Sequence, residues 1–287
     1  MQTTAPPDPN TRKPKFKPPA FACDAHCHIF GPASKFPYDP EASYHPPDSP
    51  FEALQKLHSI LGIERAVIVH ASCHGPDMRA TLDGIARSKG RYRGTAIIDE
   101  TYGEREFQRM HEGGIRGVRF NFVKHLGGRP DMAFFQRTVG RVKEMGWHLI
   151  FHLDATDLVE FDAMFKKIPV PMVIDHMGRV KAADGLEQPA FRLLLAWMEH
   201  EKFWVKICGA ERISSKGPPF TDAVPFAQRL MAAAPERILW GTDWPHPNVG
   251  KYMPNDGDLV DLFAQMAQEG ELQRKILVDN PARLYGF

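Results

Sequence analysis

The sequence has few cysteines, almost no net charge and no long apolar run. Its 287 residues include only four cysteines, too few for a disulfide framework in a chain of this length. A formal net charge of +1 gives no reason to expect a nucleic-acid partner or a membrane surface. No apolar run approaches the roughly 18 residues of a membrane span. These absences predict a reducing, cytoplasmic setting without nucleic acid or membrane as partner.

Several short motifs that mark nucleotide binding or a serine nucleophile are also absent. The sequence contains no G-x-G-x-x-G turn, no P-loop, no G-x-S-x-G elbow and no internal repeat. The main alternative fold, an open doubly wound sheet that binds a dinucleotide, would require the first of these after its first strand. Its absence argues against that fold.

The first 20 residues, MQTTAPPDPNTRKPKFKPPA, are rich in proline. They lack the apolar segment of a secretory signal. We expect residues 1–20 to form an extended, poorly ordered arm and residues 21–287 to form one folded domain.

Short apolar segments alternate with longer amphipathic ones along the rest of the chain. We predict eight strands, at 23–29, 65–71, 94–99, 115–121, 147–152, 171–176, 203–208 and 237–243. Helical patterns include 51–62, 78–90, 132–146, 190–200 and 258–270. Strands that alternate with helices pair in parallel through right-handed crossovers. Eight such units predict an α/β fold of the (β/α)8 TIM-barrel type.

The first strand, in DAHCHIF, brings two histidines, an aspartate and two cysteines close together. Side chains alternate between the faces of a strand. Strict alternation puts Asp24, His26 and His28 on the inner face and Cys23, Ala25 and Cys27 on the outer face. The cysteines are then expected to pack as small apolar residues.

Three more candidate ligands end other strands. Strands five and six end in His152 and His176, and strand eight ends in Asp243. A barrel enzyme builds its active site at this end of its strands. Imidazole and carboxylate are ligands of divalent metals such as zinc. A single buried histidine would usually be a hydrogen-bonded core residue, but four coincidences predict a functional cluster.

Basic and polar residues occur at the same ends. Arg119, Arg179 and Arg212 lie at or just after the ends of strands four, six and seven, and guanidinium groups bind carboxylates in bidentate fashion. An anionic substrate is therefore predicted. Other loop residues could bind substrate or cap turns, namely Ser72, His74, His125, His246 and Asn248. Alternation pairs Lys206 with Trp204 and leaves the direction of both open.

At these residues the sequence resembles the amidohydrolase superfamily, through the H-x-H of the first strand and the ends of strands five, six and eight. From about Phe21 onward it is more closely similar to the 2-pyrone-4,6-dicarboxylate lactonases. The similar segments are DAHCHIFGP, ASCHG, RGVRFNF, PVPMVIDHMGR, WGTDWPHPN and NPARLY. The resemblance implies hydrolysis of a carboxylated lactone in the bacterial breakdown of aromatic compounds.

The resemblance also implies roles for individual residues. In those lactonases the aspartate that matches Asp243 is the general base for water. The histidines that match His26, His28 and His176 surround the lactone carbonyl. The arginines that match Arg119, Arg179 and Arg212 hold the substrate carboxylates.

The sequence departs from the lactonase pattern at two positions. His152 replaces a tyrosine at the end of strand five, and His125 replaces an additional arginine. Those lactonases work without a metal, whereas a histidine at position 152 completes the ligand set of mononuclear superfamily members. The lost arginine leaves a muconolactone-like substrate open, as in the zinc-dependent 4-sulfomuconolactone hydrolase.

We therefore predict a lactone hydrolase with one divalent ion, zinc, bound by His26, His28, His152 and Asp243. Asp243 and His176 are the predicted catalytic residues. The predicted substrate-binding residues are Arg119, Arg179, Arg212, His125, Ser72, His74 and Asn248. Three alternatives stay open: a metal-free mechanism, a metal-dependent decarboxylase of an aromatic or muconate-type acid, and a non-catalytic binding protein. The oligomeric state is open as well, and a homo-oligomer is compatible with the sequence.

Overall fold

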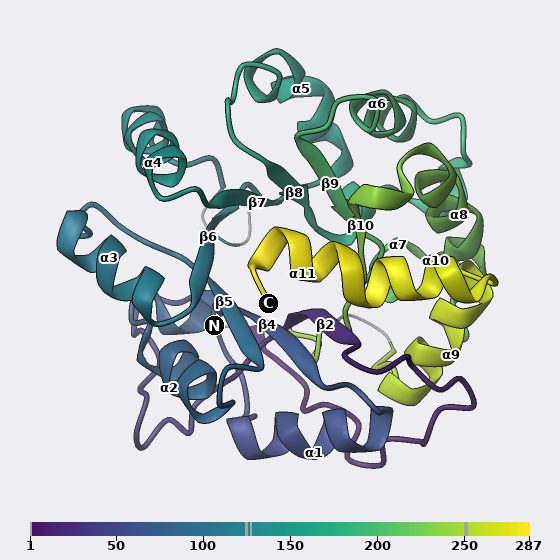
Figure 1. Ribbon diagram of the computed structural model, residues 1–287, viewed down its shortest axis with the longest axis horizontal. Helices are drawn as coiled ribbons and strands as arrows, with labels where there is room; N and C mark the ends of the chain where they lie inside the picture. The colour runs from purple at the N-terminus through teal and green to yellow at the C-terminus, as the bar shows by residue number, and fades with distance from the viewer. Residues whose placement is uncertain (1, 124–125, 127, 250–251) are drawn as a thin grey trace.

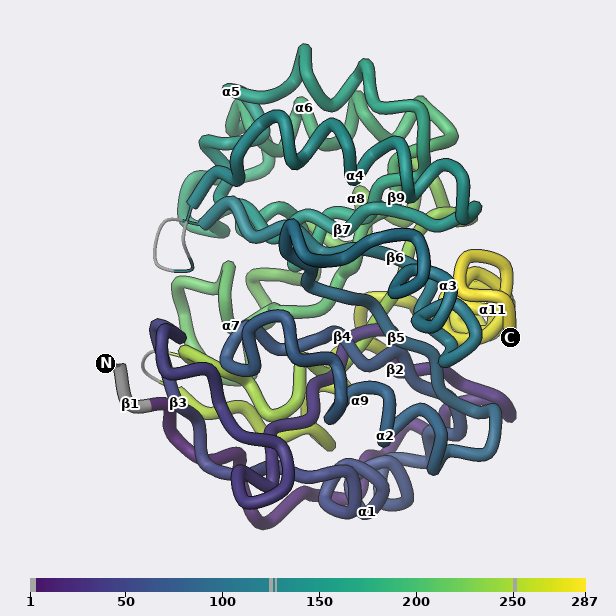
Figure 2. Tube along the Cα trace, turned by 90° about the vertical axis from the view of Figure 1, so that its left-hand side faces the viewer, coloured from purple at the N-terminus to yellow at the C-terminus, as the bar shows by residue number. Residues whose placement is uncertain are grey.

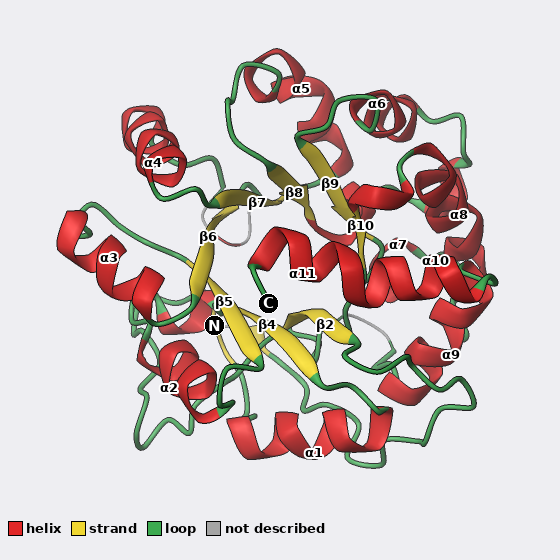
Figure 3. Cartoon of the chain, viewed as in Figure 1, coloured by secondary structure: helices red, strands yellow, loops and turns green. Residues whose placement is uncertain are grey.

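Eight parallel strands form the centre of the molecule (Figures 1 and 3). The computed structural model describes residues 2–123, 126, 128–249 and 252–287. The strands, in their order in the sheet, are β2 (Cys23–Cys27), β4 (Arg65–Val69), β5 (Tyr92–Ala96), β6 (Ile115–Asn121), β7 (His148–His152), β8 (Met172–Ile174), β9 (Phe203–Lys206) and β10 (Ile238–Leu239). Each overlaps a predicted strand, so the predicted barrel is confirmed.

The barrel closes through main-chain hydrogen bonds between β2 and the segment that follows β10. Ala25 N donates to Trp240 O over 2.9 Å, and Asp243 N donates to His26 O over 2.7 Å. Gly241 lies at this closure, where a Cβ atom would stand 2.4 Å from His26 N. Only glycine allows the two chains to approach so closely. The first and last strands of the barrel are thereby joined directly below the predicted site.

Helices surround the barrel, as the crossovers require. They are α1 (Phe51–Leu61), α2 (Arg79–Arg87), α3 (Glu104–Glu112), α4 (Met132–Glu144), α5 (Ala155–Phe165), α6 (Pro189–Trp197), α7 (Ala210–Ile213), α8 (Val224–Ala233), α9 (Asp256–Met266), α10 (Gly270–Arg274) and α11 (Asn280–Tyr285). In the described parts of the chain, none of these could span a membrane. The five helices predicted by residue range are present within three or four residues at each end.

The C-terminal helix α11 covers the amino-terminal end of the barrel (Figure 1). Tyr285 packs there with Val67, Trp204 and Leu239 from three strands. Trp204 and, two residues on, the fully buried Lys206 thus both point into the barrel. The carboxyl ends of the strands lie at the other end of the barrel, which α11 does not cover.

A bulge in β2 corrects the predicted alternation of its side chains. Between Asp24 and Cys27 the pairing with β4 shifts by one residue, and such a bulge interrupts the alternation of faces. Cys23 and Ala25 consequently join the inner cluster. Asp24 instead accepts hydrogen bonds from Thr242 Oγ1 at 2.6 Å and from His58 of α1 at 3.2 Å. The prediction that Asp24 faces the site was wrong, because the bulge turns its carboxylate toward α1.

All four cysteines, Cys23, Cys27, Cys73 and Cys208, are buried and free. Burial raises the pKa of each thiol, and that of Cys73 rises to about 12. Without a bound metal the thiols are therefore protonated, as expected of packing residues. This agrees with the expectation for Cys23 and Cys27, although Cys23 packs on the inner face.

The N-terminal arm contacts the rest of the chain at several places. Residues Gln2–Thr3 form strand β1, which pairs in parallel with β3 (Tyr44–His45). Further along, the main-chain N–H groups of Lys15 and Phe16 both donate to Asp261 of α9 over 2.8 Å. Phe16 also packs against Phe263 of α9. Proline-rich composition could not reveal these partners, which lie in the loop before α1 and in α9.

Candidate active site

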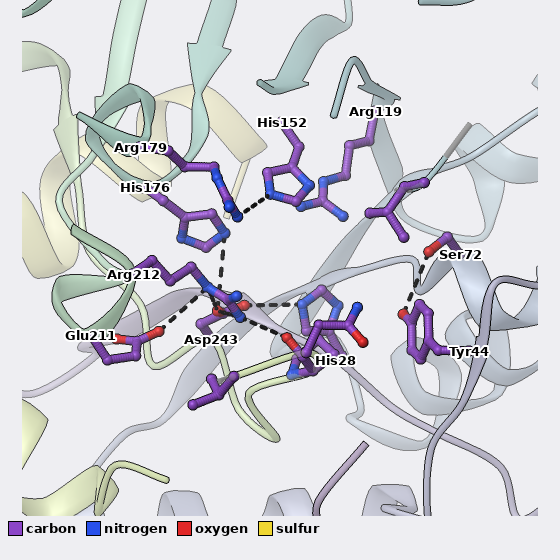
Figure 4. Close-up of a pocket in the computed structure, with 14 residues that line it drawn as sticks. His28, Tyr44, Ser72, Arg119, His152, His176, Arg179, Glu211, Arg212 and Asp243 are labelled. Atoms are coloured by element: carbon purple, nitrogen blue, oxygen red, sulfur yellow. Dashed lines mark hydrogen bonds and ion pairs between the residues drawn. The ribbon is translucent and has the colours of Figure 1, made fainter. Parts of the chain in front are cut away.

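A cavity of about 270 Å³ lies at the carboxyl ends of the strands (Figure 4). Nine of the twelve predicted site residues line it, namely His28, Ser72, Arg119, His152, His176, Arg179, Arg212, Asp243 and Asn248. His26 is fully buried just beneath them. The strand ends therefore meet as the barrel topology predicted, in a space suited to a small ligand.

Asp243 is the centre of this site. Its Oδ1 lies 3.2 Å from His28 Nε2 and 3.4 Å from His26 Nε2. Its Oδ2 accepts a hydrogen bond from Arg212 Nε over 2.7 Å. Burial alone would raise the pKa of Asp243, but the Arg212 guanidinium and the nearby histidines outweigh it and hold that pKa well below its usual range. Asp243 is consequently an ionised carboxylate at neutral pH.

His26 connects Asp243 to a charged network inside the barrel. Its Nδ1 lies 3.1 Å from Lys206 Nζ and 3.3 Å from Asp175 Oδ1. Asp175 Oδ1 also lies 3.2 Å from Lys206 Nζ, while its Oδ2 accepts from Arg119 Nε over 3.0 Å. Burial opposes ionisation of Asp175, but Lys206, His26 and Arg119 overcome it and hold its pKa well below the usual range. The Asp175 carboxylate thus offsets part of the charge of two buried cations.

His176 and Arg179 belong to a short 3-10 segment, Asp175–Arg179, with left-handed backbone. The φ angles of His176, Met177 and Arg179 are 53°, 52° and 49°. Left-handed residues other than glycine are uncommon and cluster at functional sites. Asp243, His246 and Asn248 are left-handed as well, so the strained backbone lies mainly in the two loops that carry this site.

The ring of His176 is held between Gly209 and Cys208. A Cβ atom on Gly209 would stand 2.6 Å from His176 Nδ1, and Cys208 Sγ lies 3.4 Å from the same nitrogen. Burial holds the pKa of His176 well below its usual value, so the ring is neutral. Because the Cys208 thiol stays protonated, it can donate to Nδ1. The hydrogen of the ring is then on Nε2, which points toward Asp243 and the cavity at 4.0 Å from Oδ2.

The ring of His152 lies between Arg179 and Arg119 at the cavity (Figure 4). Its Nδ1 lies 3.2 Å from Asn121 Oδ1, and its Nε2 lies 3.4 Å from Arg179 Nη1 (Figure 4). Burial and the charges of Arg119, His176 and Arg179 hold the pKa of His152 well below its usual value. The ring is therefore neutral and forms part of the cavity wall beside two guanidinium groups.

Each of the three cavity arginines is paired with a carboxylate through Nε. Arg119 pairs with Asp175, Arg179 with Asp154 at 2.8 Å, and Arg212 with Asp243. This pairing fixes the planes of the guanidinium groups and leaves the Nη groups of Arg119 and Nη2 of Arg179 for a ligand. Arg212 has a further contact to Glu211 Oε1 at 3.4 Å.

Three side chains at the centre of the site could hold a single metal ion. Nε2 of His26, Nε2 of His28 and a carboxylate oxygen of Asp243 belong to a group whose ligand atoms all lie within 4.8 Å of one another. His28 Nδ1 donates to Val69 O over 2.8 Å, so Nε2 is the ring nitrogen that faces Asp243 Oδ1 at 3.2 Å. A cation bound between them would take the place of the hydrogen in that contact. Three donors therefore fit a catalytic metal with an open position, whereas His152 does not belong to the group.

Three other histidines named in the sequence analysis, His74, His125 and His246, are not among the described residues that line the cavity. His74 does not line the cavity, because its ring nitrogens lie 3.2 Å from Gly31 N and 3.2 Å from Pro37 O. His125 lies outside the described residues. His246 Nε2 lies 3.1 Å from Asp256 Oδ1 behind the cavity wall. These contacts give His74 and His246 structural partners.

Two residues that were not predicted from the ends of the strands, Tyr44 and Glu211, also line the cavity. Tyr44 lines the cavity and its hydroxyl lies 3.4 Å from Ser72 Oγ (Figure 4). Glu211, just before Arg212, lines it too. Tyr44 belongs to a proline-flanked loop with no periodic pattern, so no sequence signal marked it. Asp175 could have been found, because it directly precedes His176 at the end of a strand.

Comparison with known proteins supports this assignment of the fold. The sequence profile of the amidohydrolase family matches residues 23–287. The chain is 44% identical to a 2-pyrone-4,6-dicarboxylate hydrolase of Comamonas testosteroni over 285 residues, which covers 96% of this chain and 93% of that protein. It is 42% identical to a 4-sulfomuconolactone hydrolase of Hydrogenophaga intermedia, covering 95% of this chain and 91% of that protein.

Solved structures show the same architecture. A protein of Agrobacterium tumefaciens superposes with a TM-score of 0.82 at 26% identity, covering 96% of this chain and 98% of its own. An amidohydrolase of Burkholderia multivorans with bound zinc superposes with a TM-score of 0.67 at 19% identity, covering 93% and 100%. A metal is thus found in this fold. From the profile match and the level of identity, the chain belongs to the amidohydrolase family.

Proposed function

We propose that this chain is a carboxylic-ester hydrolase that opens a carboxylated lactone, of the 2-pyrone-4,6-dicarboxylate or muconolactone kind. The observation that carries the proposal is the ionised Asp243 in a small cavity beside His28, His176 and three arginines. Relatives at 44% and 42% identity are named as hydrolases of such lactones. The expected setting is the bacterial breakdown of aromatic compounds.

Substrate orientation is the role of the arginines. The Nη groups of Arg119 and Arg179 bind the carboxylates of the lactone, and the Tyr44 and Ser72 hydroxyls add neutral donors. Burial raises the pKa of Tyr44, so its hydroxyl keeps its hydrogen. Holding the ring in this way places the carbonyl near Asp243 and converts binding into orientation.

Asp243 accepts a proton from water as the water oxygen attacks the lactone carbonyl. The bond between the carbonyl carbon and the ring oxygen then breaks, and the ring oxygen leaves with the electron pair. His176 Nε2–H donates to the developing oxyanion, while the proton held on Asp243 returns to the leaving oxygen. The products are a hydroxyl, or its keto tautomer, and a new carboxylic acid, which releases the second proton of the water to solvent and becomes a carboxylate. When a substrate carboxylate draws Arg212 away, the basicity of Asp243 increases.

One divalent ion, zinc, is part of the proposal. His26, His28 and Asp243 would hold it, and it would supply a Lewis acid that makes bound water more acidic. His152, the predicted fourth ligand, instead forms the wall beside Arg179. Elemental analysis of protein purified without added metal tests this part. Full activity in protein without bound metal would contradict the zinc proposal. His26 and His28 would then act directly as hydrogen-bond donors to the lactone carbonyl.

A sulfonated muconolactone is the second candidate substrate. The 42% identity to the 4-sulfomuconolactone hydrolase is almost as high as the 44% to the dicarboxylate hydrolase. Arg119 and Arg179 could hold a sulfonate as well as a carboxylate, because both are oxyanions.

Replacing the proposed base tests the catalytic assignment. We expect Asp243→Asn to lower kcat by about 10²- to 10⁴-fold, the usual contribution of a positioned base. Circular dichroism should show that the variant keeps the fold. Turnover close to that of the unmodified enzyme would show that Asp243 is not the base.

A further inference from the structure

Part of the cavity wall comes from two loops outside the barrel strands. Tyr44 lies in β3, before α1, and Pro247, Asn248 and Val249 lie in the loop between β10 and α9. Neither segment is held by the hydrogen-bond ladder of the barrel. The positions of these lining residues must therefore depend on other contacts.

The N-terminal arm contacts both loops. The backbone of Gln2–Thr3 pairs with Tyr44–His45 in register. Thr4, which is buried, donates from Oγ1 to Asn248 Oδ1 over 3.3 Å. Asn248 has a left-handed φ of 58°, a conformation that surrounding contacts must maintain. In Figure 2, β1 and β3 lie at the same end of the molecule as α7, which carries Arg212, and far from α11.

Residues 8–12 fix the arm at the far end of the same loop. Asn255, the residue that caps α9, donates to Asp8 Oδ2 over 2.8 Å and to Asn10 O over 2.9 Å. Arg12 N donates to Asn255 Oδ1 over 3.0 Å. A Cβ atom on Gly257 would stand 2.0 Å from Arg12 O, so the arm lies in direct contact with the first turn of α9. The loop is therefore held by the arm at Asn248 and again at Asn255.

We infer that the N-terminal arm is a specificity-determining part of the active site, which positions Tyr44 and Asn248 for substrate. Residues 8–16 anchor the arm on α9, and residues 2–4 extend from that anchor to the two lining residues. The arm therefore contributes to binding, whereas the chemistry at Asp243 lies on the barrel. The inference uses the lactone of the proposed function as a probe.

The test compares the full chain with a variant lacking residues 2–7, which keeps Asp8, Asn10, Arg12 and the whole α9 contact. Hydrogen–deuterium exchange is measured without substrate, in the peptides that contain Tyr44 and Asn248. We expect at least tenfold faster exchange in both peptides and an unchanged melting temperature. Unchanged exchange in either peptide would overturn the inference, whether or not any lactone is turned over.

Kinetics separate positioning from general stabilisation. We expect the deletion to raise KM for the lactone about tenfold and to change kcat less than twofold. Thr4→Val should raise KM about threefold, because the usual contribution of one hydrogen bond corresponds to a change of that size. Thr4→Ser should restore KM because it keeps the donor. The matched control is Thr101→Val, since Thr101 is exposed and outside the cavity lining. An unchanged KM, or parallel losses of kcat and melting temperature, would contradict a role in substrate binding.

Discussion

At His26, two neighbours compete for one ring nitrogen. Nδ1 lies 3.1 Å from Lys206 Nζ and 3.3 Å from Asp175 Oδ1. A hydrogen on Nδ1 can be donated to Asp175, which leaves the Nε2 lone pair for a metal, as in the usual carboxylate–histidine–metal arrangement. When Nδ1 instead accepts from Lys206, the hydrogen is on Nε2 and points toward Asp243. Lys206 therefore disfavours the tautomer that a metal needs.

This competition predicts the effect of Lys206→Met on zinc binding. Removing the ammonium should leave Asp175 as the sole partner of Nδ1 and tighten zinc binding by about tenfold, within the range known for such outer partners. The measurement is a competition titration against a chromogenic chelator. Lys202→Met is the matched control, because Lys202 Nζ contacts carbonyl oxygens outside the site, such as Ile168 O at 2.9 Å. Equal or weaker zinc binding in Lys206→Met would show that Lys206 does not oppose the metal-binding tautomer.

The Asp175–Arg179 segment shows how one short element can aim two functional side chains. Its left-handed backbone turns His176 and Arg179 into the cavity, and the ring of His176 packs directly against Gly209. Gly209 itself has φ 74°, a conformation that a residue with a Cβ atom adopts only with strain. The position of His176 thus depends on a glycine from a different strand end.

Gly209→Ala tests this dependence. The added methyl group would stand 2.6 Å from His176 Nδ1, so we expect displacement of the ring and a fall in kcat of at least about tenfold. The matched control is Gly140→Ala on α4, where a Cβ atom would meet nothing within 4 Å. That variant should keep full activity and gain about 0.5–1 kcal/mol of stability. Wild-type kcat for Gly209→Ala would show that His176 needs no such support.

The strands of this barrel could be predicted from the sequence, but the directions of several side chains could not. Alternating apolar segments located all eight strands, and residues at strand ends located His28, His176 and Asp243, because barrel topology brings those ends together. The bulge in β2 was missed, since it depends on pairing with β4 and not on composition. Tyr44 was missed because loop positions depend on distant contacts such as that with the arm. The direction of His152 was missed because Arg179 and Asn121 determine it.

At the scale of the whole molecule, buried neutral histidines make stability depend on pH. His70 shows this away from the proposed metal ligands, because it lies 2.8 Å from Thr81 Oγ1 and 2.9 Å from Gly75 O. Burial lowers the pKa of His70 from 6.5 to about 3. Between these values the unfolded chain binds a proton and the folded chain does not. The contribution of His70 is therefore complete above pH 6.5 and is lost as the pH falls toward 3.

Urea denaturation at pH 7.5 and pH 5.0 measures this loss. His70 should account for about 2 kcal/mol of the fall in unfolding free energy, at roughly 1.4 kcal/mol per pH unit below 6.5. His70→Gln should show a correspondingly smaller fall, while His200→Gln, at an exposed position, should behave like the unmodified protein. An equal fall in His70→Gln would mean that His70 is already charged in the folded state.

Barrel closure, the arm and the cavity together support one central claim, which is that the molecule opens an anionic lactone at Asp243. The most direct measurement uses a panel of carboxylated and sulfonated lactones and records ring opening, the release of acid and the release of carbon dioxide. It is made with protein treated with a chelator and with protein loaded with zinc. The account predicts ring opening of at least one of these lactones, with one equivalent of acid per turnover and no carbon dioxide. Release of carbon dioxide, or no ring opening in either form of the protein, would contradict it.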